Sequence, residues 1–217
     1  MKKYIRITPA VIISLFFIQD IMSANTTKWS VSSPDQKVLL SIEKGQDNAL
    51  SYHIEYDKKT AVEPSRLGVI MNGTDIGKSP VFISASKPRE IKENYELKVG
   101  KQLSTTDHCT ERILSFKDKN GQPFDIIMRA YNDGAAFRYA FTGKDNKIHT
   151  IQNELTEFAI PTNGKAWIFP YMLNDRQRTC YEEYAECEIP IRSKALSKQG
   201  WAFPMLFNTN GLWMLIT

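Results

Sequence analysis

Apolar and polar residues alternate along most of residues 25–217. The alternation is clearest in three stretches, residues 50–56, 124–130 and 135–141. A period of two places one set of side chains on the core face of a strand and the other set towards water. Two denser apolar runs, 38–42 and 212–216, predict strands that are buried on both faces. The pattern therefore predicts β-strands along the chain.

Turn-forming residues separate these strands. Asn-Gly pairs stand at 72–73, 120–121 and 210–211, and both residue types tolerate the positive φ that tight hairpin turns require. The stretch Asn132–Gly134, between two alternating runs, predicts a further hairpin. Residues 85–99 are polar and fit either a linker or an edge strand. Together the strands and turns predict an all-β domain, most simply an antiparallel sandwich.

The first 24 residues differ from the rest. Lys2, Lys3 and Arg6 precede a mostly apolar run over residues 7–18, and small residues follow at 22–24. This is the layout of a secretory signal peptide, and the apolar run is too short and too interrupted to span a bilayer. We therefore expect residues 1–24 to direct export, with no membrane span left after their removal.

Charge and size narrow the class of protein. Removing residues 1–24 takes away three basic and one acidic side chain, so the formal net charge falls from +4 to +2. A nucleic-acid-binding protein concentrates positive charge on one face, and this chain offers no such concentration. Residues 25–217 are sufficient for one sizeable domain.

Three cysteines, Cys109, Cys180 and Cys187, leave the disulfide question open. An exported protein could pair two of them, and Cys180 and Cys187 are nearest in sequence, but spacing does not choose among the three pairings. Buried free thiols are an equally good interpretation. Zinc is a poor one, because the chain lacks a CxxC unit and His108 is the only nearby histidine.

Several other side chains have an ordinary structural interpretation. Arg129 and Arg138 flank the predicted hairpin, where exposed strand charges or local salt-bridge partners are the common outcome. The tryptophans at 167, 201 and 213 lie in apolar surroundings that favour core packing. The sequence shows neither a Ser/His/Asp constellation nor a pair of carboxylates complete enough to hydrolyse a glycoside.

The segment "YEEYAECE" over residues 181–188 concentrates carboxylates. Glu182, Glu183, Glu186 and Glu188 fall within seven positions, with two tyrosines between them. Glutamate oxygens suit Ca²⁺, and tyrosines beside carboxylates suit a sugar. Without an accompanying calcium loop, the residues alone favour a solvated acidic surface.

Several motifs in a fixed order resemble one known family. They are "SPDQKVLLSI" at 33–42, "EPSRLGVIM" at 63–71, "RAYNDGAAFRY" at 129–139, "ELTEF" at 154–158, "YEEY" at 181–184 and "GLWMLIT" at 211–217. The set resembles the N-terminal domain of glycoside hydrolase family 97 and spans essentially all of residues 25–217. This resemblance implies a large antiparallel β-super-sandwich of the mutarotase-like kind.

The same resemblance implies an exported, typically periplasmic α-glycosidase, an α-glucosidase or α-galactosidase acting on an oligosaccharide. In this family a (β/α)₈ barrel follows the sandwich and carries the catalytic carboxylates. Residues 211–217 read as the middle of a strand, so the chain is expected to stop before that barrel, with no catalytic residue inside 25–217 and no activity by itself. The barrel of the same full-length chain is then the partner of this domain.

The resemblance also implies an active-site calcium ion held by glutamates, one of them from the sandwich. By motif position Glu182 is the expected Ca²⁺ ligand, with Glu183 as the fallback. The hairpin at 129–139 is then structural. The alternatives are a non-catalytic exported sandwich that binds carbohydrate or a protein partner, and a purely structural sandwich.

Overall fold

The structure is a computed structural model that describes residues 26–143, 147–170, 186–191 and 200–217. These residues form sixteen β-strands and, within the described ranges, no α-helix. Every strand pairing among them is antiparallel. The predicted antiparallel all-β sandwich is thus confirmed.

The first sheet is a meander of four strands in chain order. They are β1 (Thr27–Ser32), β2 (Val38–Lys44), β3 (Leu50–Tyr56) and β4 (Lys59–Arg66). Asp57 and Lys58, which join β3 to β4, both have positive φ, as a two-residue primed turn requires. Residues 38–42 were predicted to form a strand that is buried on both faces, and this is confirmed. They lie in β2, between β1 and β3, and only Leu39 among them is not fully buried.

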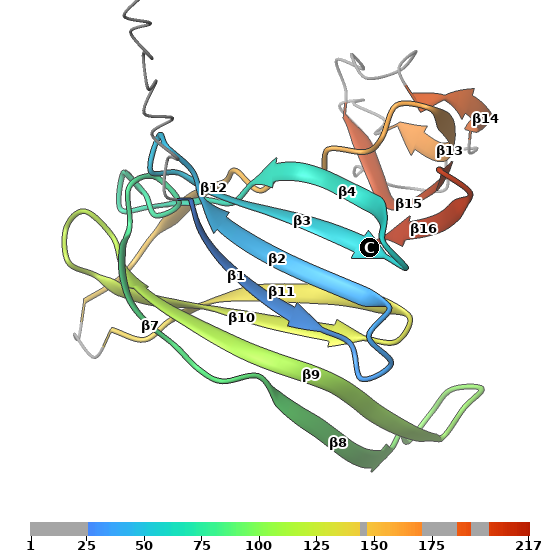
Figure 1. Ribbon diagram of the computed structural model, residues 1–217, viewed down its shortest axis with the longest axis horizontal. Helices are drawn as coiled ribbons and strands as arrows, with labels where there is room; N and C mark the ends of the chain where they lie inside the picture. The colour runs from blue at the N-terminus through green and yellow to red at the C-terminus, as the bar shows by residue number, and fades with distance from the viewer. Residues whose placement is uncertain (1–25, 144–146, 171–185, 192–199) are drawn as a thin grey trace, which may run out of the picture.

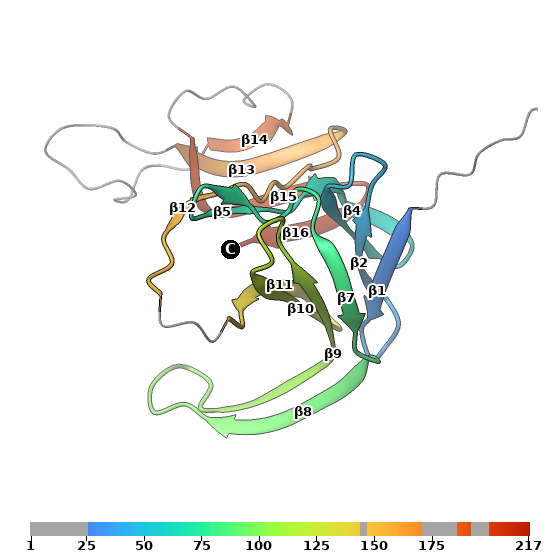
Figure 2. The ribbon, with the colours of Figure 1, turned by 90° about the vertical axis from the view of Figure 1, so that its left-hand side faces the viewer.

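The second sheet is organised around one long strand. It contains β7 (Val81–Ala85), β8 (Arg89–Glu96), β9 (Ser104–Lys117), β10 (Pro123–Tyr131) and β11 (Gly134–Phe141). One edge of β9 pairs with β10, and the other pairs with β7 and then β8. The ambiguous segment 85–99 is therefore mainly an edge strand, and the β8–β9 hairpin extends away from the sandwich in both views (Figures 1 and 2).

The main core lies between these two sheets, which face each other as two layers (Figure 1). The alternating residues of β10 were predicted to share one face, and all four are buried in this core: Phe124, Ile126, Met128 and Ala130. Tyr52 of β3 and Leu114 of β9 enter it from opposite layers. The period of two therefore identified the buried face of each strand.

Two smaller sheets complete the domain. One holds β5 (Val69–Met71), β6 (Thr74–Asp75) and β12 (Ile151–Glu154). The other, called here the fourth sheet, has the order β14 (Glu186–Pro190), β13 (Gly164–Pro170), β15 (Trp201–Thr209) and β16 (Leu212–Ile216). Its inner face forms a second core cluster, and Met214 packs against both clusters. Met214 therefore connects the fourth sheet to the main sandwich.

The three Asn-Gly pairs all form turns, but in two ways. At 72–73 and 210–211 both residues have positive φ, as predicted for primed hairpin turns. At 120–121 only Gly121 has positive φ. The backbone N–H of Asn120 instead donates a hydrogen bond to Asp118 Oδ1, and the Asn120 side chain donates to Thr74 Oγ1. Side-chain hydrogen bonds therefore add to the backbone hydrogen bonds of Asp118 in holding this turn.

Candidate functional site

The expected metal ligands belong to the connection between two strands of the fourth sheet. Strand β13 ends at Pro170 and β14 begins at Glu186. Glu182 and Glu183 lie in the intervening 171–185, outside the described residues. Their assignment as calcium ligands therefore stays a prediction, and the structure adds only that the fourth sheet supplies both ends of their connection.

The described end of the acidic segment is a solvated surface, as the residues alone favoured. Glu188 is exposed, and its Oε2 accepts a hydrogen bond of 2.8 Å from Lys165 Nζ on β13. That hydrogen bond and the charge of Lys165 lower the pKa of Glu188. Among the described residues, no group of three or more His, Cys, Asp or Glu side chains is arranged to hold a metal ion.

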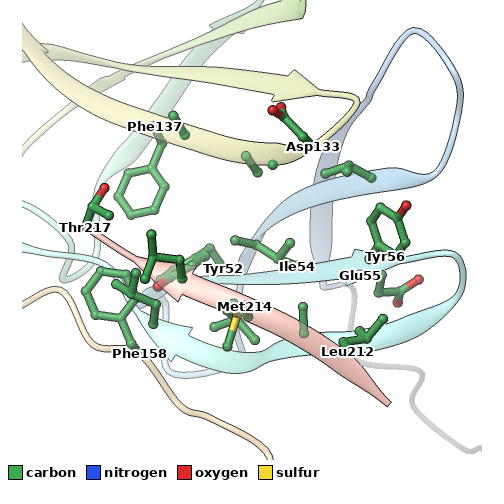
Figure 3. A pocket seen from close by; sticks show the side chains of 18 of the residues that line it. Tyr52, Ile54, Glu55, Tyr56, Asp133, Phe137, Phe158, Leu212, Met214 and Thr217 are labelled. Atoms are coloured by element: carbon green, nitrogen blue, oxygen red, sulfur yellow. The ribbon is translucent and has the colours of Figure 1, made fainter. Parts of the chain in front are cut away.

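A groove opens between the two main layers (Figure 3). Its volume is about 870 Å³, and its wall comes from β3, β4, β11, β16 and the segment around Phe158. Tyr52, Ile54, Phe137 and Met214 contribute an apolar lining. Three carboxylates also line it: Glu55, which lies 3.8 Å from the His53 ring, Asp133 at a hairpin turn, and Glu154 of β12. The groove therefore offers apolar contact surface.

Two motifs of the resemblance meet beside this groove. Backbone hydrogen bonds run from Leu155 N to Gly68 O at 2.8 Å and from Glu157 N to Arg66 O at 3.0 Å. The hydroxyl of Tyr52 donates to Glu157 O at 2.8 Å. Burial raises the pKa of the Tyr52 hydroxyl, which therefore stays protonated and keeps its role as a donor. The "ELTEF" segment is thus fixed against "PSRLG".

Tyr139 also holds this segment. Its hydroxyl lies 3.0 Å from Thr156 Oγ1, and burial raises the pKa of Tyr139 to about 12. Both tyrosines were predicted to lie on the inner face of their strands. The hydrogen bonds that they make to residues 155–158 were not predicted, because nothing local in the sequence pairs positions so far apart.

The outer face of the second sheet carries a charged network. Glu111 is only 4% exposed, and its carboxylate accepts hydrogen bonds from Arg89 Nη2 at 2.8 Å and Arg129 Nε at 2.9 Å. Arg129 Nη1 also lies 3.3 Å from Asp107. Burial by itself raises the pKa of Glu111, but the two guanidinium groups outweigh it and the pKa lies below its usual value.

The prediction that Arg129 is a local salt-bridge partner is confirmed by this network. Hydrogen bonds to Tyr131 and Glu111 raise the pKa of Arg129, so it stays charged. Arg138 is exposed, and within the described ranges it makes no ion pair. Cys109 is a buried thiol beside this network, and burial raises its pKa. Cys180 lies outside the described residues, so the predicted alternatives for its pairing stay open.

The prediction of core packing is wrong for Trp213. This side chain is 64% exposed on β16, and Leu215 beside it is 59% exposed. Trp167 is half-buried and its ring contacts that of Trp213, with ring centroids 4.9 Å apart. Strand β16 is therefore buried on one face only, because nothing in the described part of the chain covers its other face. Trp201 is half-buried against the second core cluster, as expected.

Two further observations bear on the class of protein. In the part of the chain that the structure describes, no helix has the length and apolar character that crossing a bilayer needs. The layered antiparallel sheets define the domain as a β-sandwich with an apolar groove and a charged outer face.

Residues 31–217 match the family model of the glycosyl-hydrolase 97 N-terminal domain. The chain therefore belongs to this domain family of glycoside hydrolase family 97, and the resemblance seen in the ordered motifs is confirmed.

Curated relatives are glycosidases of greater length. The chain is 26% identical over 211 residues to a "Probable retaining alpha-galactosidase" of Streptomyces bingchenggensis, a match that covers 95% of this chain and 31% of that relative. It is 25% identical over 146 residues to a "Retaining alpha-galactosidase" of Bacteroides thetaiotaomicron, covering 67% and 20%. The chain thus spans less than a third of the length of either relative.

Solved structures share the fold. A beta-arabinopyranosidase aligns with a TM-score of 0.78 and 25% identity, over 86% of this chain and 31% of that one. A glycoside hydrolase family 97 enzyme from Pseudoalteromonas, solved in complex with panose, aligns with a TM-score of 0.69 and 22% identity, over 84% and 27%. The second likeness supports the β-sandwich fold alone.

Proposed function

We propose that this chain is the N-terminal domain of an exported, calcium-dependent α-glycoside hydrolase that removes terminal α-linked sugars. Membership of the family supports the glycosidase class, and the names of both curated relatives favour an α-galactoside over an α-glucoside. The match over residues 31–217 is the observation that carries the proposal. Export to the periplasm rests on residues 1–24, which have the layout of a signal peptide.

In this proposal the domain packs on a catalytic (β/α)₈ barrel of the same polypeptide and supplies Glu182 to the active-site calcium, with Glu183 as the fallback. Glutamate oxygens are ligands that Ca²⁺ takes. In this proposal the barrel builds the rest of the pocket and supplies the other glutamates that hold the ion. When bound, the ion would orient the sugar and polarise catalytic groups.

The β-sandwich contributes position in this proposal. Strands β13 and β14 pair through Lys165–Pro190 and Ala166–Ile189 and so hold both ends of the connection that contains Glu182. A ligand anchored at both ends by a sheet loses less conformational freedom on binding the ion than one on a free chain end.

The test uses the complete gene product and aryl α-galactoside and aryl α-glucoside substrates. We expect hydrolysis of the galactoside to fall on chelation and to return with added Ca²⁺. Glu182→Gln should weaken calcium binding, measured by titration calorimetry, and reduce hydrolysis about tenfold or more, because even residues that only orient the ligands of a metal site have effects of that size. Glu186→Gln, in the same acidic segment, is the matched control.

Two results would contradict the proposal. Hydrolysis that is unaffected by chelation would exclude calcium dependence. Unchanged calcium affinity in both Glu182→Gln and Glu183→Gln would show that neither residue is the calcium ligand from the sandwich. The glycosidase class would then be tested by the hydrolysis assay alone.

A further inference from the structure

The outer face of the fourth sheet carries two rows of side chains that cross three strands. Directly opposite residues in antiparallel strands point to the same face. The register aligns Lys165, Asn208 and Trp213 in one row. It aligns Trp167, Leu206 and Leu215 in the next row. Residues between them in sequence face the opposite way: Phe207 belongs to the second core cluster, and Met214 packs against it.

The two tryptophans form one aromatic surface over the central strand β15. Their ring centroids are 4.9 Å apart with planes inclined by 39°. Trp213 keeps 64% of its surface exposed. Large aromatic side chains normally bury most of their area, so an exposed indole stacked beside a half-buried one on a sheet indicates a surface for a ligand or partner.

Hydrogen-bonding groups border this aromatic surface on the same face. The ion pair of Lys165 Nζ with Glu188 Oε2, at 2.8 Å, stands on β13 and β14, and both side chains are exposed. Asn208 is half-exposed between Lys165 and Trp213. The face therefore combines an apolar plate with an amide, an ammonium and a carboxylate at its border.

This combination matches the surface of a pyranose sugar. One face of the ring presents C–H groups that pack on an aromatic plane, and the ring edge presents hydroxyls that donate to carboxylates and accept from ammonium and amide groups. A protein partner would instead favour a face with a continuous apolar centre and its charges displaced to the rim. Here Lys165 and Asn208 stand in the same row as Trp213, and Glu188 contacts Lys165 from β14.

We propose that the outer face of the fourth sheet binds a sugar ring, with Trp213 and Trp167 as the stacking surface and Glu188, Lys165 and Asn208 as hydrogen-bonding partners of its hydroxyls. The ligand class, an oligosaccharide, rests on the proposed glycosidase function. The site itself rests on the register and on the contact between the exposed Trp213 ring and the Trp167 ring. It is a surface subsite that contains none of the expected calcium ligands.

The experiment titrates the 217-residue chain, expressed without residues 1–24 if export removes them, with melibiose and with maltotriose. Binding is followed by tryptophan fluorescence and checked by titration calorimetry up to about 50 mM sugar, well above a dissociation constant of roughly 1 mM. We expect a saturable signal for at least one sugar. Trp213→Ala should weaken binding about tenfold or more, as loss of a central aromatic contact does.

Phe203→Ala is the matched control. Phe203, on β15, is an exposed aromatic residue like Trp213, but it stands outside the two rows. It should leave the sugar affinity unchanged. Trp213 is exposed, so its replacement should not unfold the domain, and urea unfolding of the variant checks this directly. Asn208→Ala tests the hydrogen-bonding border by a second, smaller loss of affinity.

Three results would overturn the proposal. The first is that neither sugar binds over the whole concentration range. The second is that the wild-type chain and Trp213→Ala bind the sugar with equal affinity. The third is that the chain self-associates in sedimentation, that Trp213→Ala abolishes this self-association, and that the sugars have no effect on it. The last result would assign the face to a protein contact. Hydrolysis by the complete gene product tests the proposed function separately, so failure of the surface subsite and failure of the glycosidase assignment are distinguishable.

Discussion

The backbone N–H of Asp35 donates a hydrogen bond to Oδ1 of Asn132, with 3.0 Å between the two atoms. Asp35 belongs to the turn that precedes β2, and Asn132 to the turn that joins β10 to β11. The two turns come from opposite layers of the sandwich and from two motifs that are 97 residues apart. Within the turn before β2, Ser33 Oγ also donates a hydrogen bond to Asp35 Oδ1 at 2.6 Å. The Asn132–Gly134 turn therefore links the two main sheets.

Replacing Asn132 by Ala should destabilise the domain by about 1 kcal/mol, because the Asp35 N–H loses its acceptor and the turn loses a residue suited to it. Urea unfolding at neutral pH measures this change as a shift of the midpoint at constant slope. Asp133→Ala is the control, because this exposed neighbour makes no hydrogen bond within the described ranges; its effect should stay within about 0.5 kcal/mol. Equal losses in the two variants would show that the turn itself, and not the Asp35 contact, is responsible.

Arg129→Met should cost about 1–3 kcal/mol of unfolding free energy, because Glu111 is 4% exposed and would keep only Arg89 as a cationic partner. Arg138→Met, on the neighbouring strand and exposed, should change it by less than about 0.5 kcal/mol. In the double variant Glu111→Leu/Arg129→Met the loss should be smaller than in Arg129→Met, since the unpaired buried charge is gone. An additive double variant would contradict the pairing.

The depressed pKa of Glu111 gives the domain a specific acid sensitivity. The pKa in the folded protein lies below the ordinary value of 4.5, so the folded state holds the ionised carboxylate more strongly than the unfolded chain does. The stabilisation is complete above that ordinary value and is lost as the pH falls through the folded pKa. Glu111→Gln should therefore flatten the dependence of unfolding free energy on pH below about 4.5.

Urea unfolding of both proteins from about pH 6 to about pH 3 measures this difference. Glu96→Gln, an exposed carboxylate on β8, is the control and should keep the wild-type slope. A parallel pH dependence in the wild-type chain and Glu111→Gln would mean that other carboxylates determine the acid sensitivity.

The strands and most turns could be predicted because their signals are local. Alternation at 124–130 and 135–141 identifies a strand and its two faces without knowledge of the partner strand. Which strands pair is not local. The assignment of β8 to the free edge of β9 and the joining of "ELTEF" to "PSRLG" depend on contacts across many residues, and no residue in either segment signals them.

Strand β16 shows where the pattern misleads. A continuous apolar run corresponds to a strand buried on both faces only where other elements pack against both faces. The run 212–216 carries no information about which elements pack there. Met214 and Ile216 turn towards the core while Trp213 and Leu215 are exposed. The alternation therefore predicts that Trp213 and Leu215 share one face of the strand, but it does not predict that this face is exposed. The predicted ligand Glu182 lies outside the described residues, so this part of the site stays a prediction.

Tyr52→Phe should destabilise the domain by about 1 kcal/mol, because the carbonyl of Glu157 loses its donor while the ring keeps its packing. Thermal or urea unfolding measures the change. Tyr56→Phe, on the same strand, is the matched control, since the described residues give its hydroxyl no hydrogen-bond partner. Hydrogen exchange should also speed up at Leu155 and Glu157, whose N–H groups bind the backbone of residues 66–68. Unchanged exchange there would show that Tyr52 does not hold this segment.

Met214→Ala should loosen the fourth sheet from the sandwich more than it destabilises the sandwich. Met214 packs against both core clusters, and truncation of a half-buried side chain of this size should cost about 1–2 kcal/mol. Hydrogen exchange should accelerate in β13, β15 and β16 and stay nearly constant in β9 and β10, whose core is complete without Met214. Leu215→Ala, the exposed neighbour on the opposite face, should leave exchange in both regions unchanged. If Met214→Ala accelerated exchange equally in β9, β10 and the fourth sheet, the two core clusters would open as one unit, and Met214 would not be a separate connection between them.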